Sequence, residues 1–278
     1  MRNAMSVDVE DWFQVGAFET VIDRDSWPRL ESRVEANTDR VLALFAETGT
    51  TATFFTLGWV AERAPKLIRR IAEAGHEVAS HGWDHRRVFT LTPEQFRADL
   101  ARARSALEEA GGVPVTGYRA PSFSIDTRTP WAHPILAEAG YRYSSSVAPV
   151  RHDHYGWPDA PPHAFRPLTD AELIEWPITT AQLLGRQVPA GGGFFRLLPA
   201  GITDRAVRHA NAAETRPAMF YFHPWEIDPG QPRVARAPLR SRIRHYSRLG
   251  AMEGKLRGLL GRHAWGRADA IVAAEAQA

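Results

Sequence analysis

Short apolar runs alternate with amphipathic helical patterns along the first half of the chain, and this alternation constrains the fold more than any other feature. Helix-length connections between successive strands are typical of parallel sheets built from crossover units. The sequence therefore predicts an α/β fold. The strand-like runs occupy residues 4–8, 51–56, 76–79, 115–119 and 141–143.

The helical segments between these strands have recognisable ends. One helix is expected to begin at Asn37 or Thr38, to carry its apolar residues on one face, and to stop at Gly49. Another begins with Thr92-Pro93-Glu94-Gln95, which places a capping threonine before proline and a glutamine where a capping-box partner belongs. Further helices are predicted over residues 65–74 and 131–139.

The regular alternation ends in the second half of the chain. Residues 150–167 are rich in Pro, His and Asp, and we expect them to form a long surface excursion. Two more strands are predicted at residues 173–176 and 218–222, and Gly191-Gly192-Gly193 marks a flexible or tight turn between them.

Length and composition allow one large domain. We predict a single domain over residues 1–278, with residues 230–278 forming a basic helical C-terminal extension packed on it. The 34 basic residues are nearly matched by 32 acidic ones, so no nucleic-acid partner is expected. No stretch has the roughly 20 apolar residues of a membrane helix. The first residues lack the pattern of a signal peptide, which predicts a cytoplasmic protein.

The chain contains no cysteine. This excludes disulfide frameworks, zinc ribbons, iron–sulfur clusters and thiol nucleophiles together. Any bound metal must therefore be held by His, Asp or Glu.

An acidic cluster follows the first predicted strand. In Ser6-Val7-Asp8-Val9-Glu10-Asp11, the side chains of Asp8 and Glu10 are expected to project from the same face. Three acids this close together cannot all be buried without a cation. The alternative is a solvated, acidic helix cap.

Other polar residues follow later strands. His81 and His85 are four residues apart, a spacing that places two imidazoles on one face of a helical turn, although chance pairs are frequent among eleven histidines. Arg119 and His223 also come directly after predicted strands. Each has an ordinary alternative, a surface ion pair for Arg119 and a core histidine for His223. Together they indicate a site at the carboxyl ends of the strands.

The order of these motifs resembles the polysaccharide deacetylases of the NodB homology type, or carbohydrate esterase family 4. Residues 8–13, 193–199 and 223–229 are similar to the subgroup associated with exosortase (PEP-CTERM) exopolysaccharide clusters, which carries the DUF3473 region in its C-terminal part. The resemblance spans almost the whole chain. It implies a distorted seven-stranded (β/α) barrel of the glycoside hydrolase/deacetylase type.

The resemblance also implies a divalent metal, zinc first with cobalt or nickel as alternatives, held by two histidines and one carboxylate. His81 and His85 match the two histidines, and Asp8 matches the general base. The family's second acid is displaced here, so face alternation favours Glu10 as the third ligand, with Asp11 in reserve.

Two further catalytic roles carry over by motif. Arg119 would keep Asp8 charged and oriented, and His223 would protonate the departing amine. Ser144 stands where relatives often carry an aspartate that helps to orient the histidine. Five residues of the site loops are predicted to contact sugar rings, with core packing as their alternative role: Trp12, Phe13, Pro121, Phe123 and Trp225.

The implied function is removal of N-acetyl groups from a polysaccharide, with release of acetate, in exopolysaccharide biosynthesis and in association with its assembly machinery. One alternative is an amidase or cyclic-amide hydrolase for a small molecule on the same fold. Another is a catalytically silent glycan-binding scaffold that docks through its arginine-rich segment, Arg233 to Arg262. The simpler role of that segment is a helix packed across the barrel.

Overall fold

The computed structural model describes residues 1–152, 155–212 and 215–275. Positions 153 and 154 of the predicted surface excursion lie outside the described residues, as do the last three positions of the predicted domain.

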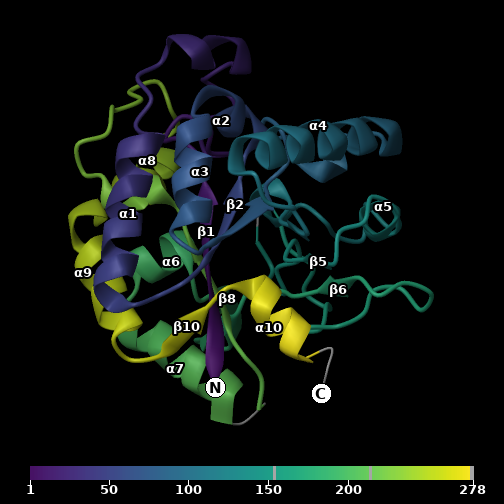
Figure 1. Cartoon of the computed structure of the whole chain (residues 1–278). Helices are drawn as coiled ribbons and strands as arrows, with labels where there is room; N and C mark the ends of the chain where they lie inside the picture. The colour runs from purple at the N-terminus through teal and green to yellow at the C-terminus, as the bar shows by residue number, and fades with distance from the viewer. Residues whose placement is uncertain (153–154, 213–214, 276–278) are drawn as a thin grey trace.

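In the described part of the chain, eight parallel strands form one curved sheet (Figure 1). Its order is β10-β1-β2-β3-β4-β5-β6, and β9 pairs with the other edge of β1, opposite to β10 and β2. Parallel neighbours need long crossovers, which the helices supply. The strands are β1 (Arg2–Val9), β2 (Thr53–Thr56), β3 (Glu77–Ser80), β4 (Gly117–Tyr118), β5 (Tyr143–Ser144), β6 (Ile174–Glu175), β9 (Met219–Phe222) and β10 (Ala264–Gly266).

Strands β1–β6 and β9 confirm the predicted distorted seven-stranded barrel. Strands β6 and β9 are not paired, so the barrel is open between them. One backbone hydrogen bond crosses this gap, from the N–H of Thr179, after β6, to the carbonyl of Met219 in β9 at 3.0 Å. The prediction for residues 230–278 needs a correction, because this segment is not helical throughout. It contributes β10, which extends the sheet alongside the start of β1.

Helices cover the outside of the sheet, and Figure 1 shows α1 and α3 side by side in front of β1 and β2. The predicted capping box of Thr92 and Gln95 is present at the start of α4. The α-helices are α1 (Val34–Thr48), α2 (Gly58–Arg63), α3 (Pro65–Glu73), α4 (Pro93–Gly111), α5 (Ala132–Glu138), α6 (Gly192–Leu197), α7 (Ala200–Ala212), α8 (Leu239–Tyr246), α9 (Leu249–Leu260) and α10 (Ala268–Glu275). Short 3₁₀ turns are η1 (Arg24–Arg29), η2 (Val88–Thr90), η3 (Pro121–Phe123) and η4 (Pro224–Ile227).

Helix α1 begins earlier than predicted. Asn37 and Thr38 are buried inside it rather than at its cap. A distant carboxylate performs the capping, because Asp11 accepts hydrogen bonds from the backbone N–H groups of Arg33 and Val34 at 2.9 and 3.3 Å. These are orphan donors of the first turn, and a negative charge there is favoured by the helix dipole.

The second half of the chain adds a hairpin that was not predicted from the sequence. Strands β7 (Thr180–Leu183) and β8 (Arg186–Pro189) pair antiparallel. The glycines predicted to form a flexible or tight turn lie just after them, at the start of α6, where a Cβ on Gly191 or Gly192 would come within 3 Å of Tyr221. Glycine at these positions therefore allows the chain to pass directly over Tyr221.

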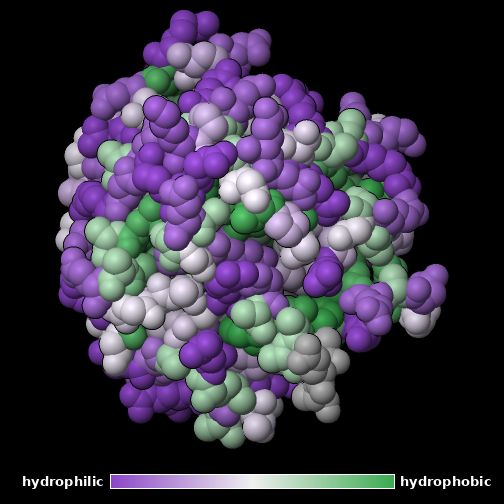
Figure 2. Space-filling view, in the orientation of Figure 1, coloured by the Kyte–Doolittle hydropathy of each residue, from purple (hydrophilic) through white to green (hydrophobic). Residues whose placement is uncertain are grey.

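Apolar side chains fill both sides of the sheet. One cluster, which includes Phe54, lies between the sheet and the outer helices, and a second, which includes Phe55, fills the barrel interior. This division follows from the alternation of side chains along β2. The face in Figure 2 is largely hydrophilic, with hydrophobic residues in small separate groups. Among the described residues, no helix is long and apolar enough to cross a membrane.

Glu77, at the first residue of β3, is buried and predicts a pH-dependent stability. Its carboxylate accepts hydrogen bonds from Thr53 Oγ1, Tyr143 Oη and the backbone N–H of Asp269, at 2.5, 2.8 and 3.1 Å. Burial, together with the charge of Asp269, raises the pKa of Glu77 from 4.5 to about 8. The folded state therefore binds more protons than the unfolded state, and the free energy of unfolding falls as pH rises from 4.5 towards 8.

We expect Glu77→Gln to remove this part of the pH dependence. Urea unfolding of both proteins at pH 5, 7 and 9 measures the effect. The wild type should lose a few kcal/mol more than the variant between pH 5 and 9. Equal losses in the two proteins would contradict a raised pKa for Glu77.

Candidate active site

Four predicted site residues lie at the carboxyl ends of neighbouring strands. Asp8 is the penultimate residue of β1, His81 follows β3, Arg119 follows β4 and His223 follows β9. The parallel ladders continue into the site, since the N–H of His81 donates to Thr56 and that of Arg119 donates to Ser80. The fold therefore brings together residues more than 200 positions apart.

Glu10, His81 and His85 form a cluster of three buried side chains. One potential ligand atom from each lies within 4.8 Å of the others. Glu10 Oε2 is 2.9 Å from His85 Nε2, and it is buried without a hydrogen-bond partner. Trp225 Nε1 donates to the other oxygen of Glu10 at 3.1 Å, and His81 Nδ1 is 2.8 Å from the carbonyl of Arg119. These contacts leave one atom of each side chain facing its neighbours.

The charge states of this cluster suit a cation. Burial lowers the pKa of His81 to about 4, so its imidazole is neutral near pH 7. Burial alone would raise the pKa of Glu10, but the imidazoles of His85, His223 and His81 lower it to about 2. Two imidazoles and one carboxylate are a donor set that divalent transition metals accept.

The structure separates Asp11 from this cluster. Its Oδ2 caps α1 and also accepts a hydrogen bond from Ser32 Oγ at 2.7 Å, while Oδ1 accepts from the N–H of Trp12 at 2.9 Å. Both oxygens are therefore occupied elsewhere. This geometry favours Glu10 over Asp11 as the carboxylate beside the two histidines, and its role as a ligand stays a prediction.

The two histidines are close together, but the predicted helical turn between them is wrong. Residues 81–85 form an irregular loop, in which Gly82 has φ +74° and His85 has φ +59°. Backbone hydrogen bonds from Gly58 and Trp59 of α2 to the carbonyls of Gly82 and Trp83 fix this loop. The ring centroids of His81 and His85 are 5.4 Å apart.

Asp8 and Arg119 form a fully buried ion pair. Arg119 Nη1 donates to Asp8 Oδ1 at 2.6 Å and to Ser6 Oγ at 2.8 Å. The rest of its guanidinium donates to the carbonyl and hydroxyl of Ser145 at 3.1 and 2.9 Å, and its Cζ lies 4.1 Å from the centroid of the Phe55 ring. Arg119 therefore fixes one oxygen of Asp8, and Oδ2 is left on the side of His223.

His223 lies on the other side of the cluster. Its Nε2 is 4.0 Å from Asp8 Oδ2 and 3.7 Å from Glu10 Oε1. Burial alone would lower the pKa of His223, but the hydrogen bond to Glu226 and the nearby charges of Glu10 and Asp8 raise it to about 9. Trp225 stacks on the imidazole, with ring centroids 5.1 Å apart. His223 is therefore protonated near pH 7 and lies on the cavity wall, and its role as a proton donor stays a prediction.

These groups open into a cavity of about 360 Å³. Phe123 and Trp225 line it, and their contact with substrate stays a prediction, whereas the other three residues predicted to contact sugar rings are absent from the lining. Trp12 and Phe13 are buried in an apolar cluster that also includes Trp225, and Trp12 Nε1 donates to the carbonyl of Glu31. Pro121 is buried and is absent from the cavity lining. Their apolar surfaces are used in packing.

Several other residues that line this cavity were not predicted from the sequence. Tyr221 lies two residues before His223 on β9, so strand alternation was a signal for it. Arg87 lies two residues after His85 and forms an ion pair with Glu19 at 2.9 Å. No local pattern indicated the others, which include Ser122, Tyr155 and Arg244.

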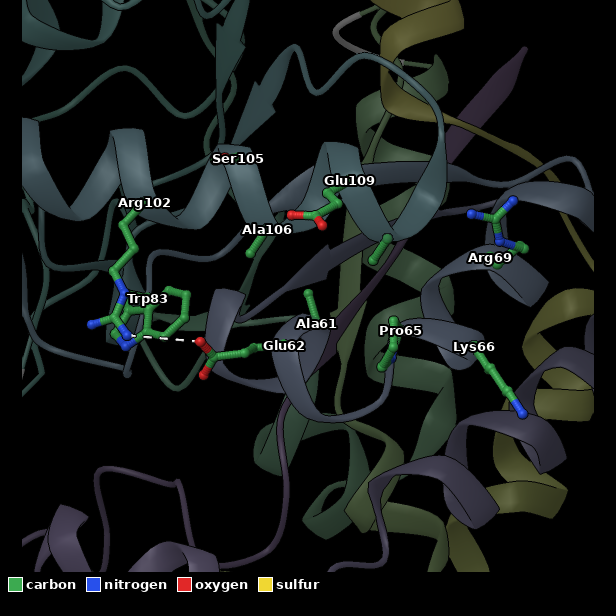
Figure 3. Close-up of a pocket in the computed structure, with 11 residues that line it drawn as sticks. Ala61, Glu62, Pro65, Lys66, Arg69, Trp83, Arg102, Ser105, Ala106 and Glu109 are labelled. Carbon is green, nitrogen blue, oxygen red and sulfur yellow. Dashed lines mark ion pairs between the residues drawn. The ribbon is translucent and has the colours of Figure 1, made fainter.

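A larger open groove of about 570 Å³ lies elsewhere, between α2, α3 and α4 (Figure 3). Its lining carries both charge signs, and Arg102 lies 3.5 Å from the ring centroid of Trp83 and 4.0 Å from Glu62. The predicted site residues, all in the described part of the chain, are absent from its lining. The candidate catalytic and metal-binding side chains therefore line the smaller cavity.

Two family models match consecutive parts of the chain. One, described as polysaccharide deacetylase, matches residues 24–144, and one described as a domain of unknown function (DUF3473) matches residues 145–273. A peptidoglycan deacetylase of Helicobacter pylori is 29% identical over 113 residues, which are 41% of this chain and 38% of that protein. A peptidoglycan-N-acetylglucosamine deacetylase of Bacillus cereus is 27% identical over 115 residues, 41% of this chain and 40% of the relative. The match thus spans about two fifths of each relative.

Solved structures share the fold over nearly the whole chain. A Mycobacterium smegmatis protein assigned to the polysaccharide deacetylases has a TM-score of 0.63 at 22% identity, covering 99% of this chain and 91% of that one. An allantoinase, PuuE, has a TM-score of 0.59 at 15% identity, covering 97% and 88%. A family 4 carbohydrate esterase from Streptomyces lividans has a TM-score of 0.50 at 14% identity, covering 93% and 89%.

Proposed function

Because this chain belongs to the polysaccharide deacetylase family, we propose that it is a metal-dependent hydrolase that removes N-acetyl groups from a glycan. One observation carries the proposal. Asp8 Oδ2 and His223 Nε2 lie 4.0 Å apart on the wall of one cavity, beside the cluster of Glu10, His81 and His85. A base, an acid and a set of metal donors are thus within reach of one acyl group.

The side chains of this cavity suit the hydrolysis of an amide. Asp8 takes a proton from the water whose oxygen bonds to the acyl carbon. Arg119 holds Asp8 in place for this transfer. As the carbon–nitrogen bond breaks, His223 Nε2 gives a proton to the departing sugar amine. The products are acetate and a free amino sugar.

Glu10, His81 and His85 would hold the metal. Zinc is the first candidate, with cobalt or nickel as alternatives, because all three accept imidazole and carboxylate ligands. When bound, such an ion supplies Lewis-acid polarisation of an acyl oxygen and increases the acidity of water. The neutral imidazole of His81 and the charged carboxylate of Glu10 are the forms that bind a cation.

We further propose an exopolysaccharide as the glycan. The resemblance of residues 8–13, 193–199 and 223–229 to deacetylases of exopolysaccharide clusters supports this choice. The likeness to the allantoinase concerns the fold alone, but it makes small cyclic amides the substrates to test in parallel.

The proposed function predicts metal-dependent acetate release. Metal-free protein is assayed on N-acetylglucosamine oligomers, then with one equivalent of zinc or cobalt, and with the His81→Ala variant as control. We expect release only after metal addition, and none from His81→Ala, because this variant lacks one of the three donors.

Two outcomes would count against the proposal. Equal release from metal-free and metal-loaded protein would contradict the metal dependence. Hydrolysis of allantoin but not of N-acetyl oligomers, with metal bound in one equivalent, would replace the glycan by a small cyclic amide.

A further inference from the structure

The imidazole of His223 is held by the carboxylate of Glu226, which lies in the 3₁₀ turn η4 that directly follows His223. Glu226 Oε2 accepts hydrogen bonds from both the ring Nδ1 and the backbone N–H of His223, at 3.0 and 3.1 Å. The two residues are joined by η4, whose first residue is Pro224, and a spacing of three brings their side chains to one face. Because Nδ1 is bonded to Glu226, Nε2 faces the cavity.

Arg196 of α6 holds Glu226 from the other side. Its Nε donates to Glu226 Oε1 at 3.0 Å. The remaining guanidinium donors reach the end of α8, with Nη2 on the carbonyl of Arg244 at 2.7 Å and Nη1 on the carbonyls of His245, at 2.9 Å, and Ser247. Both side chains of the Arg196–Glu226 pair are almost completely buried.

A buried ion pair such as this one contributes little net stability to a fold. Replacing a buried ion pair by apolar residues of similar volume is often neutral or stabilising, because two charges must be desolvated. Here both oxygens of the carboxylate are used in specific directions, one towards Arg196 and one towards His223. The resemblance implied that an aspartate at position 144 would orient the histidine. Here Ser144 occupies this position, and its hydroxyl donates to Ser146 Oγ at 2.7 Å rather than to His223.

We propose that Arg196 and Glu226 form a positioning pair for His223, and that the DUF3473 region thereby completes the active site. Residues 145–273 contain His223, Glu226, Arg196 and the end of α8 that Arg196 binds. The inference rests on the proposed function, since it concerns the proton donor of that reaction. It assigns a role to the region that the family model leaves without one.

Glu226→Gln is the sharpest test. A carboxylate accepts on both oxygens, whereas an amide accepts on one and donates from the other. In either orientation the glutamine NH₂ faces a donor, the guanidinium of Arg196 or the Nδ1 proton of His223. We expect kcat to fall about 10- to 100-fold with KM within about threefold of wild type, since supporting contacts of a site have effects of this size.

The matched control is Glu77→Gln, the same substitution at a buried glutamate at the opposite end of the barrel. It should leave kcat unchanged. Both variants are compared with wild type at equal zinc content, on N-acetylglucosamine oligomers.

Arg196→Lys is the second variant, because it keeps the charge and loses the fork of donors, so kcat should fall while folding is retained.

A spectroscopic readout separates this inference from the proposed function. In ¹⁵N-histidine-labelled protein, the Nδ1 proton of His223, assigned by its loss in His223→Gln, should exchange slowly in wild type and rapidly in Glu226→Gln. Unchanged kcat and unchanged exchange in a folded Glu226→Gln would overturn the positioning pair. Absence of acetate release from wild type would instead refute the proposed function, and the proton exchange would still test the pair.

Discussion

Asp8→Asn is expected to lower kcat for acetate release by about 10²- to 10⁴-fold, the range typical for loss of a general base or acid. The amide oxygen of the asparagine can still accept the hydrogen bond from Arg119, because Arg119 contacts only Oδ1. The amide NH₂ then replaces Oδ2 in the cavity, where it cannot take a proton from water. Steady-state kinetics on N-acetylglucosamine oligomers measure the loss.

This prediction requires that metal binding and folding survive. Asp8 is not one of the three clustered donors, so zinc stoichiometry should stay at the wild-type value. Asp228→Asn is the matched control, since Asp228 is also buried and paired with an arginine, with Arg33 Nε at 2.5 Å, but lies outside the cavity lining. It should lower stability without lowering kcat. If Asp8→Asn kept full activity, the base would have to be sought elsewhere.

The placement of the candidate site could be predicted from the sequence because strand order and face alternation are local signals. Asp8 and Glu10 share a face, and His81, Arg119 and His223 each follow an apolar run. In a parallel sheet such positions meet at one edge. No knowledge of distant contacts was needed to bring these five residues together.

The errors arose where distant contacts decide a residue's role. Trp12 and Phe13 have the aromatic rings of a sugar-binding surface, but such rings also pack a core. Only the fold brings Trp27 and Trp59 against Phe13, whose ring also contacts Trp12. The spacing of His81 to His85 fits a helical turn, yet bonds from α2 hold the segment in a loop.

The support of His223 had a partial signal in the sequence. Glu226 is three residues after His223, and Pro224 directly follows His223, which is the pattern of a short helical turn. Arg196, which binds the other oxygen of Glu226, lies 30 residues before it. Nothing in its local sequence distinguishes Arg196 from the many other arginines of the chain. Buried pairs between separate segments are set by tertiary packing.

Glu10→Gln and Asp11→Asn are expected to separate metal binding from helix capping in two adjacent acids. Glu10→Gln should weaken zinc binding by more than the roughly 10- to 100-fold typical of groups that only support a ligand, and acetate release should be lost. The reason is that the charged carboxylate of Glu10, whose Oε2 lies 2.9 Å from His85 Nε2, is replaced by a neutral amide. Competition with a chromophoric chelator measures the affinity.

Asp11→Asn should show the opposite pattern. Zinc affinity and kcat should stay within about twofold of wild type, since neither oxygen of Asp11 faces the histidines. The free energy of unfolding should fall by about 1 kcal/mol, because Asp11 accepts N–H groups from the first turn of α1 and an uncharged side chain loses the favourable interaction with its dipole. If Asp11→Asn lost zinc and Glu10→Gln kept it, the assignment of the third ligand would be reversed. In that case Asp11 would both cap α1 and bind the metal. In this fold, however, both oxygens of Asp11 accept hydrogen bonds away from the two histidines.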